Sequence, residues 1–194
     1  MEEESSGITE DQVQDLLRRL AALEVSFHVS RRFIMEIEGC LRARLFLAAL
    51  LVSPIVLEMI VRETLIKKRY SSKRTGKRIP SVVLDEIDRE AEVDKSLTFS
   101  RMAFELYETG VISDSEHKSL RSVYQRVRIP LQHGLVGRYV EANVDAEMLD
   151  IWETLGFLRS SRTPEFEENL EATALVDLEE VVRNIEAVVA KGAV

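Results

Sequence analysis

The sequence predicts an all-α protein, a single bundle of six to eight helices. Hydrophobic residues make up 45% of the 194 residues, with only 8 glycines and 4 prolines, a composition that favours helix. Apolar residues recur at steps of three and four along most of the chain, and no segment shows the alternation typical of a strand. We expect residues 8–194 to form one helical domain after a disordered N-terminus at residues 1–7, which lacks the features of a signal peptide.

Charge and cysteine content restrict the surroundings in which this chain works. The formal net charge of −8 should repel nucleic acid unless a local basic patch is presented. The single cysteine, Cys40, excludes an intramolecular disulfide and fits a reducing compartment. The most apolar run, residues 45–57, has thirteen uncharged residues, fewer than the roughly twenty that cross a bilayer. We therefore expect a cytoplasmic protein with no membrane contact and no cofactor.

The first half of the chain predicts three helices. Thr9 and Gln12 form a capping-box pattern that begins a helix ending near residue 23. A second helical pattern covers residues 30–52, with Gly39 as a candidate break. Ser53 and Pro54 then restart or kink the helix, because proline is tolerated at a first helical position. The third helix runs to about Lys68. The pattern at residues 30–52 should be the most buried, and the helices at residues 43–68 and 113–133 should lie at the centre of the bundle.

A basic segment follows, with seven lysines and arginines among the twelve residues 67–78. It has two interpretations. The first is a mobile loop, residues 67–80, that is solvated between two helices. The second is a phosphate-binding arm, because clustered cations release counterions from nucleic acid even on an acidic protein. The residues of this arm that would bind phosphate are Lys73, Arg74, Lys77 and Arg78.

Further helices are predicted at residues 81–93, 97–107, 144–158 and 175–191, with a short acidic helix opened by Pro164. The helix at 97–107 should bury Tyr107 with its apolar face and stop at Gly110. A short loop then leads into the next helix, so the two should be antiparallel neighbours. The last helix carries a valine-rich stripe, including Val176, that closes the bundle or faces a second subunit.

The helix at residues 113–134 is the one around which the rest is organised. Ser113 and Glu116 form its capping box, and Gly134 suits a C′ position. Pro130 cannot donate to the carbonyl of Arg126, so a kink is expected near the helix end. A polar row lies on each flank of its apolar stripe. One row holds Arg121, Gln125, Arg128 and Gln132, and the other holds Ser122, Arg126 and His133.

This helix carries a family resemblance. Arg128, four further residues and then His133-Gly134, preceded by Phe99-Ser-Arg-Met-Ala-Phe-Glu-Leu-Tyr-Glu-Thr-Gly-Val-Ile-Ser113, resemble the helical HEPN superfamily. Its hallmark is an arginine, four to six residues, and a histidine. Within it, the pattern is similar to a branch that includes the mannitol operon repressor. The resemblance covers about residues 43–134.

The resemblance implies two functions. One is a metal-independent endoribonuclease or RNA-binding toxin or defence component, working as a homodimer whose Arg/His pairs face each other, with RNA as substrate and a protein antitoxin as a further partner. The other is a non-catalytic protein of transcription regulation that acts through protein partners. Ile129 follows Arg128, where catalytic members carry a small polar residue, and Val127 follows Arg126. Both functions therefore stay open.

Metal-free RNA cleavage needs a base for the 2′-hydroxyl proton and a cation for the phosphorane charge. His133 could be the base, and Arg128 or Arg126 the cation, with Gln125 and Gln132 as binding residues. Alternatively, His133 stabilises a helix C-terminus and the arginines bury their stems.

Glu58 and Arg62, spaced i, i+4, form either an ordinary helix pair or a pair that orients the Arg/His site. No metal-ligand spacing surrounds His28 or His117, so no metal is expected.

Overall fold

The computed structural model describes residues 8–25, 28–71, 97–132 and 164–192. Every regular element in these ranges is a helix, which confirms the predicted all-α fold. None of these helices combines the length and the apolarity that crossing a bilayer requires. The elements are α1 (Glu10–Ala21), α2 (His28–Arg42), α3 (Phe46–Ser71), α5 (Phe99–Glu108), α6 (Asp114–Val123), the π-helix η1 (Tyr124–Arg128), α7 (Ile129–Gln132) and α10 (Pro164–Gly192).

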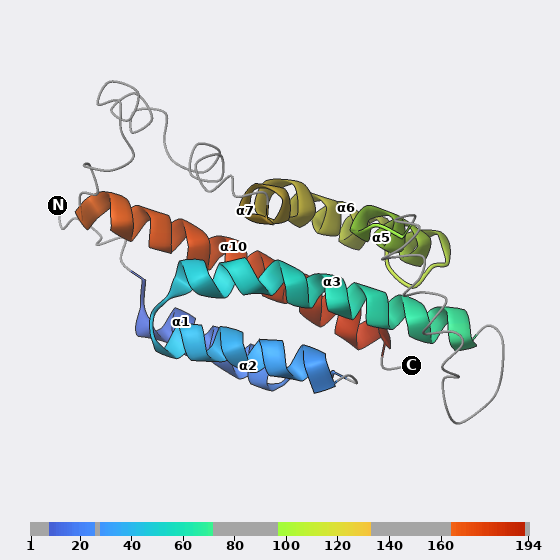
Figure 1. Ribbon diagram of the computed structural model, residues 1–194, viewed down its shortest axis with the longest axis horizontal. Helices are drawn as coiled ribbons and strands as arrows, with labels where there is room; N and C mark the ends of the chain where they lie inside the picture. Colours follow the sequence, from blue (N-terminus) through green and yellow to red (C-terminus); the bar gives the residue numbers. More distant parts are fainter. Residues whose placement is uncertain (1–7, 26–27, 72–96, 133–163, 193–194) are drawn as a thin grey trace, which may run out of the picture.

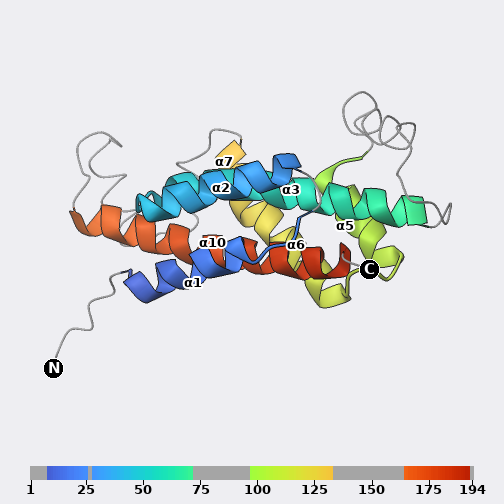
Figure 2. The same cartoon turned by 90° about the horizontal axis from the view of Figure 1, so that it is seen from below.

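The described helices form three layers, with α3 and α10 in the middle (Figure 1). The helix at residues 113–133 was predicted to be central, but its described part lies in an outer layer because α10 packs against α3 instead. These two long helices run side by side in the same direction (Figures 1 and 2). Helices α1 and α2 cover one side of the pair, and α5, α6, η1 and α7 cover the other. The core between the layers is aliphatic, and burial of this surface is the main stabilising contribution. Its fully buried residues on the central pair include Leu50, Val56, Val61, Leu65, Leu178, Val181, Val182 and Ile185.

Helix α1 begins as its capping residues predict. The backbone N–H of Gln12 donates to Thr9 Oγ1 at 3.3 Å, and the Thr9 N–H donates to Gln12 Oε1 at 3.0 Å. These two bonds satisfy backbone donors that the helix itself leaves without a partner. The predicted apolar stripe is buried, and it consists of Val13, Leu16, Leu17, Leu20 and Leu23.

The break between the second and third helices was predicted at the wrong place. Gly39 lies inside α2, and the chain turns at residues 43–45 instead. Arg44 has a left-handed backbone there, with φ of 56°. Its guanidinium donates to Glu10 Oε2 at 3.1 Å and to the carbonyl of Ile8 at 3.2 Å. Backbone bonds close the turn, from the Arg44 N–H to the Leu41 carbonyl at 3.0 Å and from the Leu45 N–H to the Cys40 carbonyl at 2.8 Å. This is the Schellman pattern of a helix end, in which the residue after the helix takes a left-handed conformation.

Helix α3 continues through Pro54 without a restart. Proline has no N–H to donate to the carbonyl four residues earlier, which is that of Leu50. The hydroxyl of Ser53 donates to this carbonyl at 3.0 Å, and Ser53 is fully buried. The serine thus satisfies the acceptor that the proline leaves open, and the helix passes through the middle of the core.

The predicted basic loop is wrong for residues 67–71, which form the last turns of α3. The half-buried Arg69 donates from Nε and Nη2 to the two carboxylate oxygens of Glu105 on α5, both at 2.7 Å. A paired fork of this kind is geometrically specific. It fixes α5 against the end of α3, and residues 72–80 of the predicted loop lie outside the described residues.

Helices α5 and α6 are neighbours, as the short connection predicts. Thr98 and Ser113 cap them, and Ser113 completes its capping box with Glu116. Gly110 takes a φ of 68° in the turn between them, a conformation that glycine adopts without strain. Tyr107 was predicted to face inward, but its side chain is 37% exposed because it lies beside His117 at the surface.

Helix α10 is longer than predicted, because residues 164–192 form one helix in place of a short acidic helix and a separate last helix. Its stripe closes the bundle, with Val181, Val182, Ile185 and Val188 buried. Val176 was placed on this stripe, but it is 62% exposed. The helices predicted at residues 81–93 and 144–158 lie outside the described residues.

The Ser53 hydroxyl gives the first testable prediction. Replacing Ser53 with Ala should lower the free energy of unfolding by about 1 kcal/mol, because the buried Leu50 carbonyl loses its donor. In a Pro54→Ala background the new N–H can donate to that carbonyl. The same serine substitution should then lower the free energy of unfolding by clearly less. Urea unfolding of the four proteins measures the coupling. Equal costs in both backgrounds would show that the hydroxyl does not compensate for the proline.

Candidate functional site

The predicted helix at residues 113–134 changes its hydrogen bonding in the middle. Helix α6 passes into the π-helix η1 at Tyr124, and the N–H of Ile129 donates to the carbonyl of Tyr124, five residues back. Pro130 explains the change, because in an α-helix its ring would clash with the carbonyl of Arg126. A π-turn widens the helix and relieves this clash. The kink expected at Pro130 is thus realised as a π-turn that carries both candidate arginines.

Arg128 is fixed by one carboxylate and two aromatic rings. Its Nη2 forms an ion pair with Glu58 of α3. Its guanidinium carbon lies 5.0 Å from the ring centroid of Tyr124 and 5.9 Å from that of Phe99. These two rings are stacked at 5.1 Å with an angle of 2° between their planes. The side chain is 18% exposed, and its Nε is buried with no hydrogen-bond partner among the described residues.

Glu58 contacts Arg128 directly, as a residue that orients this arginine must. The Glu58 carboxylate pairs with Arg128, and the i, i+4 pair with Arg62 stays open as the ordinary alternative. The two residues are 70 positions apart in sequence. Arg62 lies half-buried one helical turn further along α3. That Glu58 and Arg62 orient an Arg/His site stays a prediction.

Arg126 points to the other central helix. Its Nη2 lies 3.1 Å from Asp177 Oδ1 on α10 and also pairs with Glu180. Asp177 is 2% exposed, so Arg126 neutralises a buried charge that would otherwise be costly. Nearby, Asn184 of α10 donates to the Ser119 hydroxyl at 3.0 Å. Arg126 is thus engaged in holding α6 and η1 on α10, whereas Arg128 lies against α3 and α5.

The remaining predicted site residues are only partly described. Gln125 is exposed on η1, where it lines a groove against α5. Gln132 is the last residue of α7. The candidate base and the candidate phosphate-binding arm lie outside the described residues, and these are His133, Lys73, Arg74, Lys77 and Arg78.

The groove between α5 and the α6–η1 helix was not predicted from the sequence. Its volume is about 230 Å³, and its lining contains no carboxylate. The sequence signal was partial: the two helices were expected to be neighbours, but which flanks face each other depends on their packing. We call this cavity the α5–α6 groove. Its lining residues are Ser100, Phe104, His117, Arg121, Tyr124, Gln125 and Ile129.

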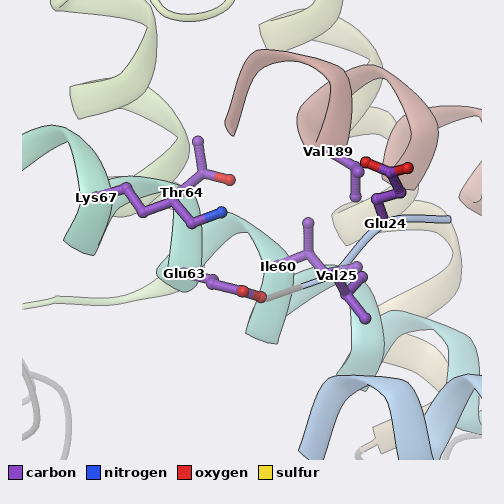
Figure 3. A pocket seen from close by; sticks show the side chains of 7 residues that line it. All are labelled: Glu24, Val25, Ile60, Glu63, Thr64, Lys67 and Val189. Atoms are coloured by element: carbon purple, nitrogen blue, oxygen red, sulfur yellow. The ribbon is translucent and has the colours of Figure 1, made fainter. Parts of the chain in front are cut away.

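A second pocket lies between α3, α10 and the segment after α1 (Figure 3). Its volume of about 10 Å³ is close to the space of a single water molecule, so it is too small for a ligand. The carboxylates of Glu24 and Glu63 and the ammonium of Lys67 line it, beside the apolar side chains of Ile60 and Val189. Of these two pockets, the α5–α6 groove is the one with room for a ligand.

Metal-ligating side chains do not gather in the ranges that the structure describes. No group of three or more histidine, cysteine, aspartate or glutamate residues there could hold a metal ion. His117 instead stacks on Tyr107 at 5.1 Å between ring centroids, and Cys40 is half-buried against the core.

The Arg126 contacts predict a stability effect. Replacing Arg126 with Met should lower the free energy of unfolding by about 1–3 kcal/mol, because Asp177 stays buried without this cation. Arg183, which is exposed on α10, provides the matched control through Arg183→Met. Urea unfolding at neutral pH compares the two variants. If the free energy of unfolding falls by the same small amount in both variants, Arg126 contributes no more to stability than a surface arginine.

The Arg69–Glu105 pair predicts a pH dependence. The hydrogen bond from Arg69 holds the pKa of Glu105 below its ordinary value of 4.5, against the opposing effect of burial. A carboxyl whose pKa is lowered by folding stabilises the protein above its unfolded pKa, and this contribution is lost as the pH falls through the folded pKa. Glu105→Gln should therefore be less stable than wild type at neutral pH, and the difference should shrink at about pH 3. A pH-independent difference would contradict this assignment.

Comparison with known proteins gives no match. No family model matches the chain, no curated protein matches it, and no solved structure matches it. The function is therefore inferred from the residues of this chain and from their geometry.

Proposed function

We propose that this chain is a HEPN-like protein that acts on RNA, with Arg128 and His133 as the working pair of a metal-independent endoribonuclease. One observation carries the proposal. Arg128 stands on a π-turn with its guanidinium held by Glu58 and by the stacked rings of Phe99 and Tyr124. Single π-turns inside α-helices occur frequently at functional sites. His133 follows directly after α7 in the sequence.

The fixed position of Arg128 supports its role as the phosphate-stabilising cation. A guanidinium has five N–H donors, and the ion pair with Glu58 uses one nitrogen. The remaining donors leave capacity for a phosphate, and the side chain keeps some exposure. A cation already in place when charge develops in a transition state needs no reorganisation, which makes its stabilisation effective. Arg126 is less suited to this task because Asp177 and Glu180 already occupy it.

In this proposal His133 removes the proton of the 2′-hydroxyl, whose oxygen attacks the phosphorus while Arg128 holds the charge on the phosphorane. The P–O5′ bond then breaks to give a 2′,3′-cyclic phosphate, and the leaving 5′-oxygen takes a proton from the imidazolium or from water. The ordinary histidine pKa near 6.5 allows proton transfer at neutral pH. Glu58 orients Arg128 from α3. A homodimer would bring two such pairs together, and the activity would suit a toxin or defence component with a protein antitoxin. RNA as substrate and a single cysteine both fit the cytoplasm.

A second candidate function is non-catalytic regulation through protein partners, as the branch with the mannitol operon repressor suggests. The observation that favours it is the engagement of both arginines by acidic side chains of the central helices. Such pairs stabilise the packing of η1 without any ligand. In this function the Arg/His motif would keep the bundle together, and an exposed surface would bind the partner.

Metal-free cleavage of labelled single-stranded RNA tests the proposal. In the presence of EDTA, wild-type protein should cleave the RNA. The cleavage rate of His133→Ala should be lower by roughly a hundredfold or more, the usual contribution of a general base. Arg128→Lys keeps a cation but loses the planar fork, so it should also lose most activity.

The exposed Arg183→Ala is the matched control and should cleave as wild type does. Gel filtration with light scattering establishes that all four proteins are folded and reports whether they are dimers. Absence of cleavage by the wild type, or full activity of His133→Ala, would contradict the nuclease and leave the regulator as the better account.

A further inference from the structure

We propose that the α5–α6 groove binds a nucleobase together with its phosphate. This inference rests on the proposed action on RNA, and it assigns base binding to a site separate from Arg128 and His133. Helices α5 and α6 pack side by side (Figure 1). The residues that line the groove come from α5, from α6 and from the turns that follow it. Its volume of about 230 Å³ is below the roughly 300 Å³ at which pockets for drug-sized ligands begin, so it has room for a nucleobase while the attached ribose and phosphate stay at the open rim.

Aromatic rings supply the surface on which a base would stack. Phe104 and Tyr124 line the groove from its two helices. Tyr124 is held in place by its stacking on Phe99, and Phe104 lies 6.0 Å from the ring of His117. Stacking on such rings binds bases of any sequence, because every base has a π-face. Rings that neighbouring rings already position lose little freedom when a planar ligand binds.

The charge of the groove suits a phosphate, although the chain as a whole is acidic. Arg121 is exposed in the groove, and no carboxylate is among its lining residues. The pocket of Figure 3 differs in this respect, because Glu24 and Glu63 line it. An exposed arginine can offer a bidentate pair of N–H donors to a phosphate. On a surface of net charge −8, a cavity with a cation and without carboxylates is a favourable place for an anionic ligand.

Polar groups beside the rings could hold the base edge. Gln125 offers both a carbonyl acceptor and amide donors, and Ser100 offers a hydroxyl. Single-stranded RNA is recognised by this combination of stacking and hydrogen bonds to exposed base edges. The groove also adjoins the proposed catalytic arginine, because Tyr124 lines the groove while its ring lies 5.0 Å from the Arg128 guanidinium. A strand with one base in the groove would therefore pass close to Arg128.

Fluorescence anisotropy with 2′-O-methyl oligonucleotides tests the inference without any cleavage. Wild-type protein should bind labelled homopolymers, and Phe104→Ala should weaken binding by about tenfold or more, the usual effect of losing one stacked base. Phe104 is half-buried, so the exposed Arg121→Glu is the second variant, and it should weaken binding without a packing defect. Arg183→Glu makes the same charge change on exposed α10 and should bind within about twofold of wild type.

Competition with adenosine monophosphate distinguishes a free nucleotide from a base within a strand. Displacement of the oligonucleotide would show that a single free nucleotide is enough to occupy the groove. Retention of the oligonucleotide would show that the groove binds a base only as part of a strand. Both results support the groove if Phe104→Ala and Arg121→Glu weaken binding. Equal binding by wild type, Arg121→Glu and Arg183→Glu, or no binding by wild type, would overturn the inference. Because the oligonucleotides cannot be cleaved, this failure is distinct from failure of the proposed nuclease, which the His133 and Arg128 variants report.

Discussion

The attachment of one π-helical turn to both central helices is the interaction on which the position of the candidate site depends. Arg128 ties η1 to α3 through Glu58, and Arg126 ties it to α10 through Asp177 and Glu180. Helices α3 and α10 form the middle of the bundle, so these pairs fix η1 to both central helices. The groove and the candidate site both take their positions from this attachment.

The cause of the π-turn is local and lies in the sequence. Pro130 is incompatible with the α-helical hydrogen bond and with the space at the Arg126 carbonyl. On α3, the Ser53 hydroxyl serves the Leu50 carbonyl in place of Pro54. Both prolines therefore lie within helical segments, and neither ends its helix in a loop.

Features that depend on neighbours in sequence could be predicted, and those that depend on packing could not. The capping boxes at Thr9 and Ser113 were correct because each needs only a residue three positions away. The break at Arg44 was missed because an arginine takes the left-handed position at which glycine or asparagine usually marks a helix end. The Glu58–Arg128 pair spans 70 residues, so the sequence could offer Glu58 as a candidate but could not choose its partner. The groove was missed because two helices form it together.

A double-mutant cycle on Glu58 and Arg128 tests the central claim most directly. The free energy of unfolding is measured for wild type, Glu58→Gln, Arg128→Met and the double variant. If the ion pair holds η1 on α3, the two substitutions should be coupled by about 0.5–3 kcal/mol, the range found for residues in direct contact. Additive losses, with no coupling beyond about 0.3 kcal/mol, would contradict the claim that this pair positions the turn and its arginine.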